Sequence, residues 1–202
     1  MKILAVETAT RCQGVAVVDD FQVLAQETYS DCASHASILV TNIDRLLQSL
    51  ALSLTQLDGL AVSLGPGSFT GLRVGLSTMI GFRFATQLPL VTVSTLEAMA
   101  WNVKDESRQI CPILQASRGD VYWALFRWEQ DRLLRLSDDK HGTLSQLIDS
   151  IDELTILFGE GWVAYTKELK NMLGEKAISG PEEAMLPSAV SVAFCSLSSF
   201  YA

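Results

Sequence analysis

Gly65-Pro66-Gly67-Ser68-Phe69-Thr70-Gly71 lies between the apolar run Leu60 to Leu64 and a segment with helical spacing, and this stretch decides the fold. It is typical of a strand, a glycine turn and a helix start. Glycine tolerates positive φ, Pro66 fixes its own φ, and Ser68 is a favourable helix cap. Backbone N–H groups at such a turn can face an anion or another chain. The stretch is neither a Walker loop nor a dinucleotide fingerprint, so it leaves the function open.

Short β-rich runs precede this turn and predict a three-stranded antiparallel start. These strands are expected at Lys2 to Glu7, Gly14 to Val18 and Val23 to Thr28. A helix is expected over Ala33 to Leu52, because its apolar residues repeat at helical spacing along one stripe. After the strand Leu60 to Leu64, the pattern predicts helix Phe69 to Ala85, strand Leu90 to Val93 and helix Thr95 to Val103.

A second round of elements begins at Ile110. The expected strands are Ile110 to Ala116, Val121 to Trp128, Leu133 to Leu136, Leu154 to Phe158 and a short one near Ala177 and Ile178. The expected helices are Leu144 to Ile151, Trp162 to Met172 and Glu182 to Phe200. Two rounds predict a duplicated α/β fold with two ribonuclease-H-like lobes, residues 1–105 and 106–202, each a mixed sheet flanked by helices. A single mixed-sheet domain is the alternative.

Charge argues against direct binding of nucleic acid. The 202 residues include 15 basic and 23 acidic ones, a net charge of −8, with no cluster of Lys or Arg. Phosphate neutralisation needs such clusters, so the chain alone should bind RNA poorly and reach it only through a complex. The hydrophobic content of 49% comes without an uncharged run of the roughly 20 residues that cross a bilayer. We therefore expect no membrane segment, and apolar surface buried in a large core or against a partner.

The start of the chain and its cysteines indicate a cytoplasmic protein with reduced thiols. The apolar stretch at Met1 to Val6 is too short for a signal peptide. The four cysteines show no CxxC spacing, which favours buried thiols over a zinc site or a disulfide framework; they are Cys12, Cys32, Cys111 and Cys195.

Three collinear blocks resemble the TsaB family, also called YeaZ, within the actin-like (ASKHA) superfamily. They are Met1 to Thr10, Gly65 to Gly75 and Pro89 to Leu96. Weaker matches follow at Gly119 to Ala124, Gly159 to Trp162 and Met185 to Pro187, so the resemblance spans nearly the whole chain. Two departures stand out. Gln115-Ala116-Ser117 replaces the family's Asp-Ala-Arg, and the chain stops at Tyr201-Ala202, before the expected family tail.

The resemblance implies a subunit of the bacterial machinery that makes threonylcarbamoyladenosine in tRNA. In that family the protein is not the catalyst but binds the catalytic homologue TsaD, an ATPase subunit TsaE joins the pair, and the chain forms homodimers when alone. Two rivals stay open, an autonomous actin-like ATPase or kinase and a glycoprotease-type metallopeptidase.

Histidine content bears on catalysis. The catalytic relative carries two metal-binding histidines four residues apart, a spacing that puts both imidazoles on one helix face. The resemblance aligns these positions with Thr95 and Met99, which are poor ligands for a hard or borderline divalent cation. The only histidines are His35, near a predicted helix start, and His141, in a predicted solvated loop. We therefore expect no metal centre, no catalytic residue and no cofactor.

Degenerate nucleotide loops are the remaining candidate site for a small molecule. Glu7, Thr8 and Thr10 occupy the first loop of the actin-like pattern, yet this loop lacks the glycine that lets a phosphate approach. Gly65 and Gly67 form the turn. Gly159 and Gly161 mimic the adenine side, although Glu160 adds negative charge.

The helix Phe69 to Ala85 is apolar or small on both faces, which predicts burial on two sides. One face should meet the chain's own sheet or first helix and the other a second chain, and a helix wrapped within one lobe is the alternative. Arg73 and Arg83 suit partner contact or interlobe anchoring, and Ile38 lies outside the core stripe of the first helix. The predicted partner or dimer interface comprises Ile38, Phe69, Leu72, Arg73, Leu76, Met79, Ile80 and Arg83.

Overall fold

The computed structural model describes residues 1–29, 35–105 and 107–201, and these residues form two compact units. The first unit contains Met1–Ala98 and Pro187–Ala202, and the second contains Met99–Leu186. Each has its own mixed sheet and its own hydrophobic core, and the fold belongs to the actin-like class.

The sheet of the first unit has the strand order β3-β2-β1-β4-β5. Its strands are β1 (Lys2–Glu7), β2 (Gln13–Asp19), β3 (Gln22–Tyr29), β4 (Gly59–Gly65) and β5 (Leu90–Ser94). β1 to β3 pair antiparallel, while β4 runs parallel to β1 and β5 parallel to β4. The predicted antiparallel start is therefore confirmed, and helical connections allow the parallel strands that follow.

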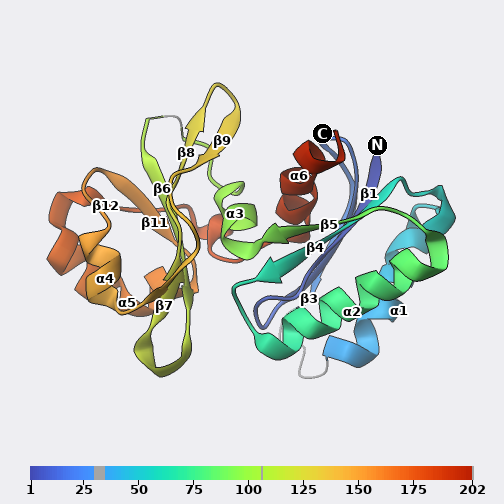
Figure 1. Cartoon of the computed structure of the whole chain (residues 1–202), viewed down its shortest axis with the longest axis horizontal. Helices are drawn as coiled ribbons and strands as arrows, with labels where there is room; N and C mark the ends of the chain where they lie inside the picture. Colours follow the sequence, from blue (N-terminus) through green and yellow to red (C-terminus); the bar gives the residue numbers. More distant parts are fainter. Residues whose placement is uncertain (30–34, 106, 202) are drawn as a thin grey trace. The chain divides into compact units, whose positions relative to one another are not determined.

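Helices cover both faces of this sheet, as Figure 1 shows. α1 (His35–Ser49) and α2 (Phe69–Thr86) pack on one face, and α6 (Ala189–Phe200) packs on the other. The short elements η1 (Leu54–Gln56) and α3 (Thr95–Ala100) complete the connections. α2 begins where Ser68 accepts a hydrogen bond from the N–H of Gly71, and it ends at Gln87, whose φ of 61° is left-handed. Strand residues alternate between the two faces, so Leu4 and Val6 pack in the core with α1 and α2.

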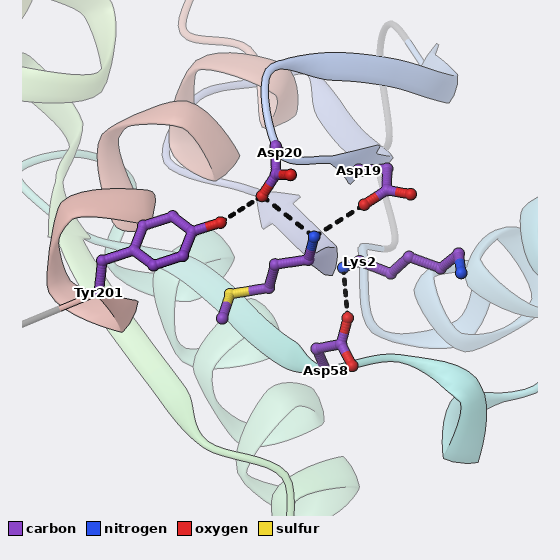
Figure 2. Close-up of polar contacts among 6 residues, drawn as sticks. Lys2, Asp19, Asp20, Asp58 and Tyr201 are labelled. Carbon is purple, nitrogen blue, oxygen red and sulfur yellow. Dashed lines mark hydrogen bonds and ion pairs between the residues drawn. The ribbon is translucent and has the colours of Figure 1, made fainter.

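Polar contacts join the end of the chain to the β2–β3 turn (Figure 2). The Met1 ammonium donates to Asp19 at 2.8 Å and to Asp20 at 3.0 Å. The Tyr201 hydroxyl donates to the same Asp20 carboxylate, which lowers the pKa of Asp20 and raises that of Tyr201. The residue that follows α6 is therefore tied to a turn of the sheet on which α6 packs.

The second unit has the strand order β10-β7-β6-β11-β12, with β8 paired to β6 and β9 paired to β8. The strands are β6 (Gln109–Gln115), β7 (Val121–Trp123), β8 (Phe126–Glu129), β9 (Arg132–Arg135), β10 (Lys140–Gly142), β11 (Thr155–Phe158) and β12 (Ala177–Ser179). Its helices are α4 (Leu144–Asp149) and α5 (Glu160–Leu173), with the 3₁₀ turns η2 (Ser117–Gly119), η3 (Gly174–Lys176) and η4 (Glu182–Ala184). Trp123 and Trp162 lie in its core with Leu147 and Leu169.

Three predicted elements differ from the structure. The strand expected over Val121 to Trp128 is divided into β7 and β8, because the N–H of Leu125 bonds to Ser137 and its carbonyl to Leu136. His141, expected in a solvated loop, lies in β10 opposite Tyr122 of β7. The helix expected over Glu182 to Phe200 begins only at Ala189.

The position of α6 also changes the division of the chain. The sequence places residues 106–202 in one lobe, whereas Pro187–Ala202 belong to the first unit. The reason is contact: α6 packs against β1, β2, β4 and β5. Along the described part of the chain, no helix is both long and apolar enough to span a bilayer.

Candidate partner-binding surface

The glycine turn at the start of α2 is closed by the chain's own β1–β2 loop. The N–H of Ser68 donates to the carbonyl of Ala9 at 2.7 Å. A Cβ on Gly67 would lie 2.4 Å from that carbonyl oxygen, and one on Gly71 would lie 2.0 Å from the carbonyl oxygen of Thr8. These glycines are explained by close packing, and the Ser68 N–H is already used within the chain.

The three loop residues of the candidate nucleotide site are buried. The exposed fractions of Glu7, Thr8 and Thr10 are 1%, 0% and 5%. Burial raises the pKa of the Glu7 carboxyl from 4.5 to about 7, and hydrogen bonds from backbone N–H groups, that of Ala9 first, oppose that rise only in part. A carboxyl group that is buried and partly neutral near pH 7 is a weak ligand for a cation.

Gly159 and Gly161 lie in the second unit, where packing also accounts for them. A Cβ on Gly159, whose φ is 102°, would lie 2.3 Å from the carbonyl oxygen of Ile113, and one on Gly161 would lie 2.4 Å from the Cγ2 of Ile113. Both glycines let the start of α5 approach β6 closely. Gly65 and Gly67 belong to the first unit, so the predicted loops come from different units.

Possible metal ligands do not cluster. Within residues 1–29, 35–105 and 107–201, no group of three or more His, Cys, Asp or Glu side chains could hold a metal ion. Thr95 and Met99 are both fully buried. His141 lies 3.5 Å from the Asp120 carboxylate and packs against the ring of Tyr122. His35 begins α1, and its side chain lies outside the described residues. Burial raises the pKa of the Cys111 thiol, which makes it a poor nucleophile.

The outer side of α2 exposes large apolar side chains instead. The exposed fractions are 69% for Phe69, 38% for Ile80 and 76% for Phe84. The Arg73 guanidinium lies over the Phe69 ring, 4.0 Å from its centroid, and Arg83 is exposed nearby on the same helix. No atom of the described residues would lie within 4 Å of a Cβ on Gly81, so another backbone can approach the helix there. We call Phe69, Arg73, Ile80, Gly81 and Phe84 the outer stripe.

The structure determines which side of α2 faces the chain's own core. Gly71 and Gly75 face inward, and a Cβ on Gly75 would lie 2.3 Å from the Thr8 hydroxyl. Met79, predicted for the interface, is fully buried in the core of the first unit. Leu72, Leu76 and Ile38 are half-buried, and Leu76 packs against the core.

Sequence reasoning missed two exposed residues. Phe84 is absent from the predicted interface, although it follows Ile80 by four residues and so shares its side of the helix. Val40 of α1, which is also absent from the predicted interface, is 50% exposed.

A groove lies beside α2, between α1 and the segment that contains η1. Its volume is about 460 Å³, and it is lined by Val40, Thr41, Ile43, Asp44, Leu47, Leu52, Ser53, Leu54 and Phe82. Most of this lining is aliphatic or aromatic, and Asp44 provides a single carboxylate. Exposed aromatic residues, arginines and an apolar groove are features of protein interfaces.

Comparison with known proteins gives consistent matches. Residues 22–189 match the protein family described as TsaD, tRNA N6-adenosine threonylcarbamoyltransferase. The tRNA threonylcarbamoyladenosine biosynthesis protein TsaB of Escherichia coli (strain K12) is 30% identical over 173 residues, which cover 82% of this chain and 74% of that protein. TsaB of Bacillus subtilis (strain 168) is 25% identical over 96% of this chain and 86% of its own length.

A solved structure has the same fold. YeaZ from Pseudomonas aeruginosa superposes with a TM-score of 0.82 at 22% identity, over 99% of this chain and 92% of that one. With the fold, the family match and the sequence relatives in agreement, the chain belongs to the family described as TsaD, tRNA N6-adenosine threonylcarbamoyltransferase, and within it to the TsaB (YeaZ) proteins.

Proposed function

We propose that this chain is a non-catalytic subunit in the biosynthesis of threonylcarbamoyladenosine in tRNA, and that it works by binding a catalytic, TsaD-like homologue through the outer stripe of α2. The pathway is the one named for its TsaB relatives. The observation that carries the mode of action is the exposure of Phe69 and Phe84 at opposite ends of one helix.

The outer stripe has the composition that binding hot spots favour. Exposed phenylalanines bury large apolar areas when they are covered, and arginines supply directional contacts at the rim of an interface. The groove beside α2 offers a receptor for an apolar side chain of the partner, with Asp44 available to a basic group. A partner that is itself related to this chain can present a similar pair of helices, which would form a four-helix contact with α1 and α2.

Catalytic silence is supported by the state of the polar residues. The hydroxyl and carboxyl groups of the β1–β2 loop are buried, and the glycine turn is filled by that loop. We therefore assign the chemistry to the partner, with no cofactor held by this chain. We propose that an ATPase subunit of the TsaE type joins the complex, that tRNA is reached only through the complex, and that two copies of this chain pair through the same surface when the partner is absent.

The test is co-purification of the chain with its candidate catalytic homologue, encoded in the same cell. Phe84→Glu and Ile80→Glu should weaken assembly by about tenfold or more, because each puts an unpaired carboxylate into a desolvated contact. Val163→Glu is a matched control, since Val163 is 63% exposed on α5, which belongs to the second unit. If both α2 variants keep the wild-type melting temperature and co-purify as well as the wild type does, the outer stripe is not part of the interface.

A further inference from the structure

Glu7 is the last residue of β1, and its side chain lies on the sheet face that α6 covers. It pairs with Gly14 of β2, and the parallel register between β1 and β4 puts Ser63 on its other side. The exposed fractions of Glu7 and Ser63 are 1% and 0%. A Cβ on Gly14 would lie 3.3 Å from the Cβ of Ala189, the first residue of α6, and 3.6 Å from the Cβ of Glu7. The carboxyl group is therefore enclosed by two strands and the start of a helix.

Two oxygens at this site lack a hydrogen-bond partner among the described residues, namely Oε2 of Glu7 and Oγ of Ser63. The other carboxyl oxygen, Oε1, accepts the N–H of Ala9. A buried polar atom without a partner is destabilising, so a group or ligand that pairs these atoms is expected. Glu7 and Ser63 are neighbours, and a bond between their free oxygens would satisfy both.

The charges near the site determine what supplies that bond. α6 contains no acidic or basic residue, and its only ionisable side chain is the Cys195 thiol. The residues of the neighbouring strands on this face are uncharged: Gly14, Ala16 and Val18 of β2, Ala61 and Ser63 of β4, and Val91 and Val93 of β5. Arg11, in the loop after β1, is exposed. A carboxylate here would be a buried anion that faces no cationic side chain among the described residues, whereas a carboxylic acid is neutral and gains an O–H donor.

We propose that the folded chain holds a proton at Glu7, which donates it to the Ser63 hydroxyl, and that this proton is a structural ligand of the first unit. Loss of the proton leaves a buried negative charge between the strands and the first turn of α6. The same carboxyl group accepts a hydrogen bond from the Ala9 N–H, and the carbonyl of Ala9 accepts one from the Ser68 N–H at the start of α2. The Glu7 carboxyl therefore lies beside the start of α6 and is linked through Ala9 to the start of α2.

The experiment is an NMR titration of the full chain, labelled with ¹³C at the side-chain carboxyl of glutamate. The Glu7 resonance is the one missing from Glu7→Gln, and Glu168→Gln, at an exposed position of α5, serves as the control that removes a different resonance. The Glu7 resonance should titrate near pH 7, because burial raises the pKa of this carboxyl to about 7. If Glu7→Gln does not fold, Ser63→Ala identifies the Glu7 resonance, because among the glutamate resonances only that of Glu7 should change its titration midpoint.

Two results would overturn the proposal. A Glu7 resonance that titrates at the ordinary value for glutamate, about pH 4.3, means that the site holds an anion at neutral pH. A midpoint that falls when potassium chloride replaces choline chloride means that a monovalent cation, rather than a proton, fills the site.

Discussion

Replacing Glu7 with glutamine should remove a pH dependence of stability that the wild-type chain shows between pH 4.5 and about 8. The folded chain holds the Glu7 proton more tightly than the unfolded chain does, because the folded pKa is raised from 4.5 to about 7. This contribution to the free energy of unfolding is complete below pH 4.5 and is lost as the pH rises through 7. Glutamine is neutral at every pH, so the variant lacks this term.

The size of the effect follows from the pKa difference. The difference between 7 and 4.5 is 2.5 units, and each unit corresponds to about 1.4 kcal/mol. The wild type should therefore lose about 3 kcal/mol relative to Glu7→Gln between pH 4.5 and pH 8. We compare the two proteins by the slope of the free energy of unfolding against pH. This comparison removes the pH-independent cost of replacing the side chain, and it removes the titration of the groups that both proteins share.

The assay is urea denaturation at a series of pH values, followed by far-UV circular dichroism for the whole chain. Tryptophan fluorescence adds a probe of the second unit alone, because all four tryptophans lie within Met99–Leu186; they are Trp101, Trp123, Trp128 and Trp162. Glu168→Gln, at an exposed position, should keep the wild-type slope. Equal slopes for wild type and Glu7→Gln, or a wild type that gains stability relative to the variant as pH rises, would refute the reasoning.

Further outcomes follow from packing, from the end of α6 and from charge. Gly71→Ala should lower the free energy of unfolding of the first unit by about 1–3 kcal/mol, because the new Cβ would lie 2.0 Å from the Thr8 carbonyl oxygen. Gly81→Ala has open space around it and should stabilise α2 by up to about 1 kcal/mol. Urea denaturation measures both free energies, and equal effects of the two substitutions would contradict the packing described for Gly71. Tyr201→Phe removes the hydroxyl that donates to Asp20, so amide hydrogen exchange in the last turn of α6 should become faster. Unchanged exchange rates there would show that this hydrogen bond does not stabilise the end of the helix. The isolated chain should bind tRNA weakly and in a salt-sensitive way, and a submicromolar dissociation constant at physiological salt in a filter-binding assay would contradict the charge argument.

Local pattern was enough to predict most of the first unit. β1 is bounded at Lys2 and Glu7 as expected, because a continuous apolar run ends at a charged residue, and α2 begins at Phe69 because Ser68 caps it. The antiparallel start and the parallel strands after it also agree with the sequence reading. These elements are determined by residues that are close together in the sequence, within one helical turn or one strand, and sequence periodicity contains information over that distance.

Distant contacts explain what the sequence reading missed. The division between β7 and β8 arises because Leu125 exchanges hydrogen bonds with Leu136 and Ser137, more than ten residues away. β10 is short and polar, and it is defined by its pairing with β7 rather than by its own residues. α6 packs on strands from the other end of the chain, which no local pattern reports.

The candidate surface could be predicted only in part, because the apolar residues of α2 occur all around the helix. Phe69, Met79 and Ile80 all belong to the predicted interface, but Met79 is buried in the core while Phe69 and Ile80 are exposed. The inward side was decided by Gly71 and Gly75, whose missing side chains let the β1–β2 loop approach. The close contact at these two glycines is therefore with the chain's own loop.

That contact has a consequence for the way this chain can act. An anion at the glycine turn would need backbone donors of the turn, yet the Ser68 N–H is bonded to Ala9, and Thr8 fills the space beside Gly71. To admit a phosphate, the loop would have to move, break that hydrogen bond at a net cost of about 0.5–1.5 kcal/mol, and expose the buried Glu7 carboxyl. The same movement would release the N-terminal end of α2 from the sheet and disturb the outer stripe. A phosphate bound at the turn would therefore disturb the surface that we propose for docking, and the hydrogen bonds present keep the turn closed.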